Sequence, residues 1–186
     1  HLLVEHPRQA AGPSEKSAGY PVVLHTLWGG RVNRPYSLAL TAAWQERFGE
    51  RPVLQQDDDA ILLVSSEPRA ASDILGLVRP ENLERLLRRR LESSGFFGAR
   101  FRENAARALL LPRSSARRRT PLWLTRQRAK ALLHAVSRYD DFPLLLETWR
   151  TCLRDEFDME GLAKLLGELA DGTIRVTEVE TRAASP

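Results

Sequence analysis

The feature that most constrains this chain is a stretch, residues 91–126, that is both strongly basic and strongly apolar. Its phenylalanines and leucines distinguish it from a solvated charge run, and its many arginines distinguish it from an ordinary core helix. At about 100° per residue, Phe97, Phe101, Ala105 and Ala108 fall on one helical face. The pattern predicts a helix that is anchored by one face and presents guanidinium groups on another.

The positive charge of the chain is concentrated around this stretch. Residues 85–130 hold 14 arginines and lysines against two acids, a net charge of +12, whereas the segments before and after carry −3 and −5. Such a local excess is typical of a surface that binds a polyanion. Arg100, Asn104 and Arg107 form a stripe beside the apolar face. That stripe fits phosphate contact, and it also fits a structural helix with a solvated arginine edge.

The four tryptophans divide into two pairs. Trp44 and Trp149 lie on apolar helical faces, which favours core packing. Trp28 precedes Gly29-Gly30 and Arg31, and Trp123 lies between an arginine run and Arg126. A tryptophan in a basic setting can stack on an unpaired base. Leucine and proline around Trp123 argue equally for burial, so both interpretations stay open.

Several motifs resemble those of one helicase family. Residues 94–112, 119–126 and 140–153 look like the large-helicase-related (Lhr) family of superfamily 2 helicases, and residues 25–33 fit the same pattern. They resemble the region called the DEAD/H-associated domain, which follows the two RecA-like motor domains in that family. The resemblance covers about residues 20–184.

The resemblance implies a parent protein that is an ATP-dependent, DNA-translocating helicase of the cytoplasm, acting in DNA repair on single-stranded DNA or RNA:DNA duplexes. ATP and Mg²⁺ are then expected in motor domains outside this chain, which has no Gly-x-x-x-x-Gly-Lys-Ser/Thr phosphate loop. Its partners would be nucleic acid and the other domains of the same polypeptide. The first residue, His1, and the abrupt end indicate a segment of a longer protein. No apolar run approaches the length of a transmembrane helix, so no membrane partner is expected.

The predicted fold class is α+β, with a small mixed or antiparallel sheet packed against about five or six helices. Residues 1–19 are expected to be loop, with Leu2–Val4 a strand left from the preceding domain. The accessory domain then spans 20–184: residues 20–66 are mainly β with one helix, 67–172 mainly helical, and 173–181 a closing strand. Strands at 20–28, 53–65 and 173–181 would form the sheet.

Helix boundaries follow from capping residues and prolines. Asn33 is predicted to cap the first helix, Pro80 to open another, and Pro112 to stop the central one. Gln127–Tyr139 is expected to be helical. Asp140 or Asp141 and then Asp158 are the predicted caps of the last two helices, and the second of these ends at Asp171-Gly172.

No residue pattern points to catalysis within the chain. Asp57-Asp58-Asp59 could hold Mg²⁺ but is more typical of a hairpin turn. His25 and His134 lack ligand partners at a recognisable spacing, and Cys152 is expected to be a small buried side chain. We therefore expect no catalytic residue, no metal and no cofactor here.

The sequence thus predicts a nucleic-acid surface. The residues expected in it are Arg88, Arg89, Arg100, Asn104, Arg107, Arg113, Arg117, Arg118, Arg119, Trp123, Arg126, Trp28 and Arg31. Two alternatives remain: an intramolecular brace whose arginines pair with acidic faces of the motor domains, and a free-standing enzyme with a pocket of perturbed titratable groups.

Overall fold

The computed structural model describes residues 1–8, 19–111 and 121–183. The chain forms two compact units: unit 1 combines residues 1–90 with 157–186, and unit 2 is residues 91–156. The chain passes between them twice, at Arg90–Leu91 and at Glu156–Phe157. The two units are therefore described separately.

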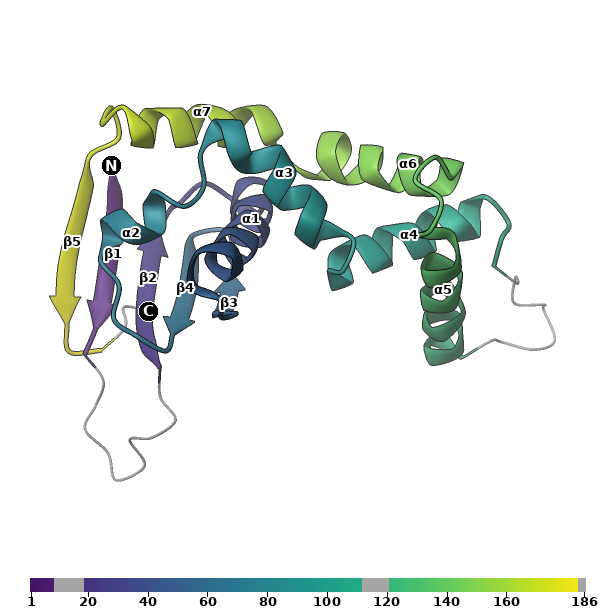
Figure 1. Cartoon of the computed structure of the whole chain (residues 1–186), viewed down its shortest axis with the longest axis horizontal. Coiled ribbons are helices and arrows are strands. Elements are labelled where there is room, and N and C mark those ends of the chain that lie inside the picture. The colour runs from purple at the N-terminus through teal and green to yellow at the C-terminus, as the bar shows by residue number, and fades with distance from the viewer. Residues whose placement is uncertain (9–18, 112–120, 184–186) are drawn as a thin grey trace, which may run out of the picture. The chain divides into compact units, whose positions relative to one another are not determined.

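Unit 1 is built on a five-stranded mixed sheet with the strand order β3-β4-β2-β1-β5 (Figure 1). Its strands are β1 (Leu2–Pro7), β2 (Tyr20–His25), β3 (Val53–Gln56), β4 (Ala60–Ser65) and β5 (Val176–Thr181). The β1–β5 pair is parallel, and the other neighbouring pairs are antiparallel. Together with the helices this confirms the α+β class, and the predicted hairpin of β3 and β4 is confirmed as well.

Strand β1 differs from the prediction. The sequence pattern assigned Leu2–Val4 to a preceding domain, but β1 lies inside this sheet between β2 and β5. Leu3 is opposite His25 on one side and Thr177 on the other. The position of a strand in a sheet depends on pairing partners that lie far away in the sequence, so the local apolar pattern could not reveal it.

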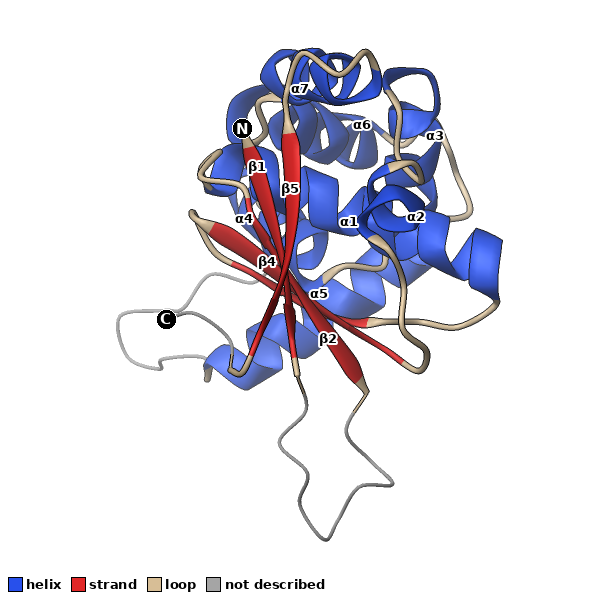
Figure 2. Ribbon diagram, turned by 90° about the vertical axis from the view of Figure 1, so that its left-hand side faces the viewer, coloured by secondary structure: helices blue, strands red, loops and turns tan. Residues whose placement is uncertain are grey.

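One face of the sheet and the helices α1 (Gly30–Phe48), α2 (Ala71–Leu75), α3 (Pro80–Leu91) and α7 (Met159–Ala170) supply the core of unit 1. Figure 2 shows the sheet from its β5 edge, with α1 and α2 along the same side. Leu24, Ile61 and Leu63 from the sheet are fully buried, as are Tyr36 and Trp44 from α1. Burial of Trp44 confirms the prediction made from its helical face.

The start of α1 is a correction to the predicted cap at Asn33. The helix begins at Gly30, and Gly29 takes a φ of 80° that favours glycine. Asn33 is buried inside the first turn, where its amide donates to the carbonyl of Asp57 at 2.9 Å and accepts from Thr26 at 2.8 Å. Its side chain therefore fastens the β3–β4 turn to the helix, a role that requires tertiary structure.

The described residues of unit 2 form three α-helices and a π-helix: α4 (Gly95–Arg107), α5 (Leu122–Val136), α6 (Pro143–Arg150) and η1 (Thr151–Glu156). Phe97, Phe101 and Ala105 of α4 are fully buried, as the helical spacing predicts. Ala108 is exposed instead. It is the C-cap, and Leu109 follows with a φ of 60°, so the helical periodicity ends before it.

Other boundaries are partly as predicted. Pro80 opens α3, and the Asp158 side chain caps α7 by accepting from the Gly161 amide at 2.9 Å. Helix α5 begins five residues before Gln127, at Leu122, and ends at Val136 rather than Tyr139. The N-cap of α6 is Phe142, which forms no side-chain capping bond, and not Asp140 or Asp141. Pro143 at the first position fixes φ without any capping side chain, which explains this start.

Candidate nucleic-acid interface

Three arginines of α3, Arg85, Arg88 and Arg89, are paired with acidic side chains within unit 1. Arg85 donates to both carboxylate oxygens of Glu46 at 2.8 and 3.1 Å, and Arg89 binds the same carboxylate. Arg88 pairs with Glu84 one turn earlier at 2.9 Å. The hydrogen bond from Arg85, followed by that from Arg89, lowers the pKa of Glu46. Two predicted site residues, Arg88 and Arg89, thus already have anionic partners.

The predicted stripe on α4 divides into two parts. Arg100 pairs with Glu103 at 2.7 Å and with Glu156 at 3.3 Å. Asn104 is buried, and its amide donates to the hydroxyls of Thr148 and Thr151 at 3.3 and 3.4 Å. Arg100 therefore connects α4 to η1, and Asn104 connects it to both α6 and η1.

Arg107, the third member of the stripe, is exposed. On α5, Arg126, Arg128 and Lys130 are exposed too. Within the described ranges none of these four cations is joined to an acidic side chain. The sequence pattern indicated Arg107 and Arg126 but not Arg128 and Lys130. With the predicted helix beginning at Gln127, Arg126 lay outside it and was not connected with Lys130 at i, i+4.

Trp123 is the most accessible of the predicted aromatic contacts. Its side chain is 65% exposed, and that of neighbouring Leu122 is 77% exposed. Both lie in the first turn of α5, whose N-cap, Pro121, supplies no side-chain capping bond. The burial alternative for Trp123 is therefore not what the structure shows. An uncapped helix start with an exposed indole can contact both a phosphate and a base.

Trp28 and Arg31 lie in unit 1, at the start of α1. The Trp28 ring is half-buried and packs at 5.7 Å from the ring of Tyr36, so part of its surface is used internally. Arg31 is exposed, and its backbone carbonyl accepts from the Asp158 amide at 3.0 Å. The remaining predicted contacts, Arg113, Arg117, Arg118 and Arg119, lie outside the described residues.

The acidic β3–β4 turn and His25 form hydrogen bonds within the fold. Asp57 accepts from the amides of Asp59 and Ala60 at 2.9 and 2.8 Å, which is a turn geometry. His25 binds Glu5 at 2.8 Å, and His134 is exposed on α5. A search of the described ranges finds no group of three or more His, Cys, Asp or Glu side chains that could hold a metal ion.

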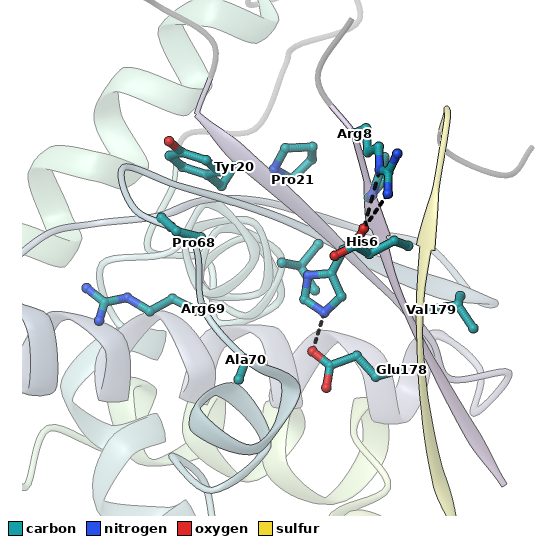
Figure 3. Close-up of a pocket in the computed structure, with 12 residues that line it drawn as sticks. His6, Arg8, Tyr20, Pro21, Pro68, Arg69, Ala70, Glu178 and Val179 are labelled. Atoms are coloured by element: carbon teal, nitrogen blue, oxygen red, sulfur yellow. Dashed lines mark hydrogen bonds and ion pairs between the residues drawn. The ribbon is translucent and has the colours of Figure 1, made fainter.

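Figure 3 shows a cavity of about 770 Å³ in unit 1, lined mainly by the ends of β1, β2 and β5 and by residues 68–70. Two pairs of its side chains bind each other across β1 and β5: His6 with Glu178 at 2.6 Å, and Arg8 with Glu180 at 2.9 Å. Arg69, also in the lining, pairs with Glu67 at 2.7 Å. His25, His134 and Asp57 do not line it. The cavity therefore does not bring together the groups on which the enzyme alternative depended.

The arrangement is that of an α+β module in which four exposed cations without an acidic partner among the described residues, and an exposed indole, lie on α4 and α5 of unit 2. The chain belongs to the DEAD/H-associated family, whose model matches residues 1–186. Among the described helices, none has the length and apolar content needed to cross a bilayer.

Similar proteins carry this region as a small part of a longer chain. The chain is 36% identical to the "Lhr helicase/uracil glycosylase" of Escherichia coli over all of its own length and 12% of that protein. It is 30% identical to the "ATP-dependent helicase Lhr-Core" of Methanothermobacter thermautotrophicus, over 89% of this chain and 19% of the relative.

A solved structure, the Mycobacterium smegmatis helicase Lhr bound to ssDNA and AMP-PNP, matches with a TM-score of 0.82 and 37% identity. The match covers 100% of this chain and 23% of that chain. The chain thus spans less than a quarter of the length of each of these similar proteins.

Proposed function

We propose that this chain is an accessory domain of an ATP-dependent, Lhr-type DNA helicase and that it contacts the tracking nucleic-acid strand. The family match and the Lhr relatives support the first part. The mycobacterial relative, which is bound to ssDNA, supports a single strand as the nucleic acid; an RNA:DNA duplex is the second substrate to test. ATP and Mg²⁺ bind, on this proposal, in motor domains outside the chain.

The observation that carries the contact surface is the set of cations without acidic partners in unit 2. Arg107, Arg126, Arg128 and Lys130 are exposed and bind no acidic side chain among the described residues. Phosphates are the anions that such guanidinium and ammonium groups meet on nucleic acid. We assign backbone contact to these residues, and base stacking to Trp123.

This assignment leaves out several of the thirteen residues that the sequence predicted to contact nucleic acid. Arg88, Arg89 and Arg100 would have to give up carboxylate partners before they could bind a phosphate. Asn104 would have to leave a buried site. Contacts of this kind, to phosphates and to base faces, do not read sequence. The proposed role is therefore to grip the strand while the motor moves it.

The test is a titration of a labelled single-stranded oligonucleotide, followed by fluorescence anisotropy at several salt concentrations. We expect affinity to fall steeply with salt. For single strands the slope of log K against log [salt] is about −0.7 for each phosphate contact. The Arg107→Gln/Arg126→Gln variant should therefore lose about 1.4 from that slope. The same titration with an RNA:DNA duplex compares the two substrates.

The matched control is Arg88→Gln/Arg89→Gln, which removes the same charge from α3, where both arginines are already paired. Its slope should stay near that of the parent chain. Equal losses in both variants would refute the assignment to unit 2. A folded protein that binds no oligonucleotide even at low salt would instead favour the intramolecular brace.

A further inference from the structure

The sheet of unit 1 has a second face, which we call the outer face. The strand register places its residues in three rows across the sheet: Val53, Val64 and Pro21; Gln55, Leu62, Val23, Glu5 and Val179; and Ala60, His25, Leu3 and Thr177. Residues directly opposite each other on neighbouring strands lie on the same face. The rows therefore form one continuous surface over all five strands.

The two faces of the sheet are covered to different degrees. The inner face is the one toward α1 and α2 (Figure 2). On it, Leu2, Val4 and Leu24 are fully buried. On the outer face, Val23 and Glu5 at the centre are buried, but the surrounding apolar side chains are half-buried. These are Leu3, Leu62, Val64 and Val179. Val53, at the β3 edge, is 63% exposed.

The sequence of the central strands is that of a sheet covered on both sides. Strand β4 reads Ala-Ile-Leu-Leu-Val-Ser, and β1 and β2 contain the unbroken apolar runs Leu2–Val4 and Val22–Leu24. A sheet with one face in water shows alternation instead, with apolar residues inside and polar residues outside. The helices of unit 1 account for the apolar residues of the inner face only.

The outer face also lacks the chemistry of a nucleic-acid surface. Among the described residues that form its three rows none is Arg or Lys, although the chain has 28 such residues in total. Its acid, Glu5, binds His25 at 2.8 Å and accepts from the Thr181 hydroxyl at 2.6 Å. The charged groups of this face are thus satisfied within the sheet, and what remains for a partner is apolar and uncharged. That complements a protein surface.

We infer that the outer face is the docking surface for another domain of the same polypeptide, an inference that rests on the proposed function as part of a longer helicase. With strands about 4.8 Å apart and rows about 6.8 Å apart, the face covers about 500 Å² at most. Separate proteins that form stable complexes bury about 800 Å² each. A tethered domain needs less, because the linker raises its effective concentration to about the millimolar range.

The test is site-specific photo-crosslinking in the full-length polypeptide. The photoreactive residue p-benzoylphenylalanine replaces Leu62 in one variant and Val64 in another, and the irradiated protein is digested and analysed by mass spectrometry. We expect cross-links from both positions to peptides outside residues 1–186. A control at Leu146, a 52% exposed side chain on α6 of unit 2, measures non-specific cross-linking. Unchanged thermal unfolding shows that each variant is folded.

A mixture of isotopically light and heavy protein separates contacts within one chain from contacts between copies. Mixed light–heavy cross-links would identify a second copy as the occupant and overturn the inference. Yields no higher than at Leu146 would overturn it as well. The experiment contains neither nucleic acid nor nucleotide, so its result is independent of the oligonucleotide titration. Either proposal can therefore fail alone.

Discussion

Helix α3 in unit 1 and helix α5 in unit 2 are both rich in arginine, but their charges have different partners. On α3, Arg88 binds Glu84 of its own helix, and Arg89 binds Glu46 of α1. On α5, Arg126, Arg128 and Lys130 bind no acidic side chain within the described part of the chain. The comparison teaches that a net charge of +12 over residues 85–130 combines charge used in folding with charge available to a ligand.

The surroundings explain the difference. Helix α3 contains Glu81 and Glu84 and lies beside an acidic residue of α1, so its guanidinium groups meet carboxylates at the surface of unit 1. Helix α5 contains no acidic residue from Leu122 to Val136. The same residue type therefore contributes to structure in one unit and to a candidate binding surface in the other.

The largest expected effect is on the framework of unit 2. Phe101 is fully buried, so Phe101→Ala should destabilise this unit by about 3–5 kcal/mol. Denaturant unfolding monitored by circular dichroism measures the loss. If unit 2 carries the binding surface, oligonucleotide affinity should disappear at the denaturant concentration at which the unit unfolds. Phe96→Ala is the control, because Phe96 is only half-buried and should cost less.

Exposed and packed tryptophans should respond differently. Trp123→Ala should weaken single-strand binding by about 1–3 kcal/mol, the usual contribution of one stacked base, and leave the unfolding temperature unchanged. Trp28→Ala should lower the unfolding temperature, because Trp28 packs against Tyr36. Anisotropy and calorimetry measure the two quantities. A Trp123→Ala variant with parental affinity would remove stacking from the proposal.

The paired arginines of α3 should matter for stability more than for binding. Arg85→Gln/Arg89→Gln removes both partners of Glu46 and should lower Tm by at most about 2–4 °C, because exposed ion pairs are weak. The pKa of Glu46 should rise toward its usual value, since the hydrogen bonds that lower it are gone. Differential scanning calorimetry and NMR titration test this. A marked loss of affinity would mean that α3 also contacts the ligand.

The smallest effect concerns Cys152 in η1, which is fully buried. Burial raises the pKa of its thiol from 9.0 to about 12. The folded protein should therefore react slowly with a thiol reagent at pH 8, and rapidly once unfolded. Because the folded state keeps the proton, the contribution to stability is complete below pH 9 and is lost as pH rises toward 12. Fast labelling of the folded protein would show that unit 2 opens around this helix.

Local sequence determined a large part of the architecture. Strand-length runs on both sides of the Asp57–Asp59 turn predicted the β3–β4 hairpin. Helical spacing predicted the buried face Phe97–Phe101–Ala105 and the burial of Trp44. Asp158 could be predicted as the cap of α7 because a capping side chain bonds to a backbone amide in the first turn of its own helix. These features depend on interactions between residues that are close in the chain, or on which face of a helix or strand is apolar and must be buried.

The absence of acids along α5 is likewise visible in the sequence, and it leaves Arg126 and Lys130 without a partner on their own helix. Only the tertiary structure decided the rest. It placed β1 inside the sheet between β2 and β5, and it moved Asn33 from a cap to a buried bond with the Asp57 carbonyl. It also paired Arg89 with Glu46 of α1. The physical reason is that a strand's partners and a charge's partner come from distant segments, which only packing brings together.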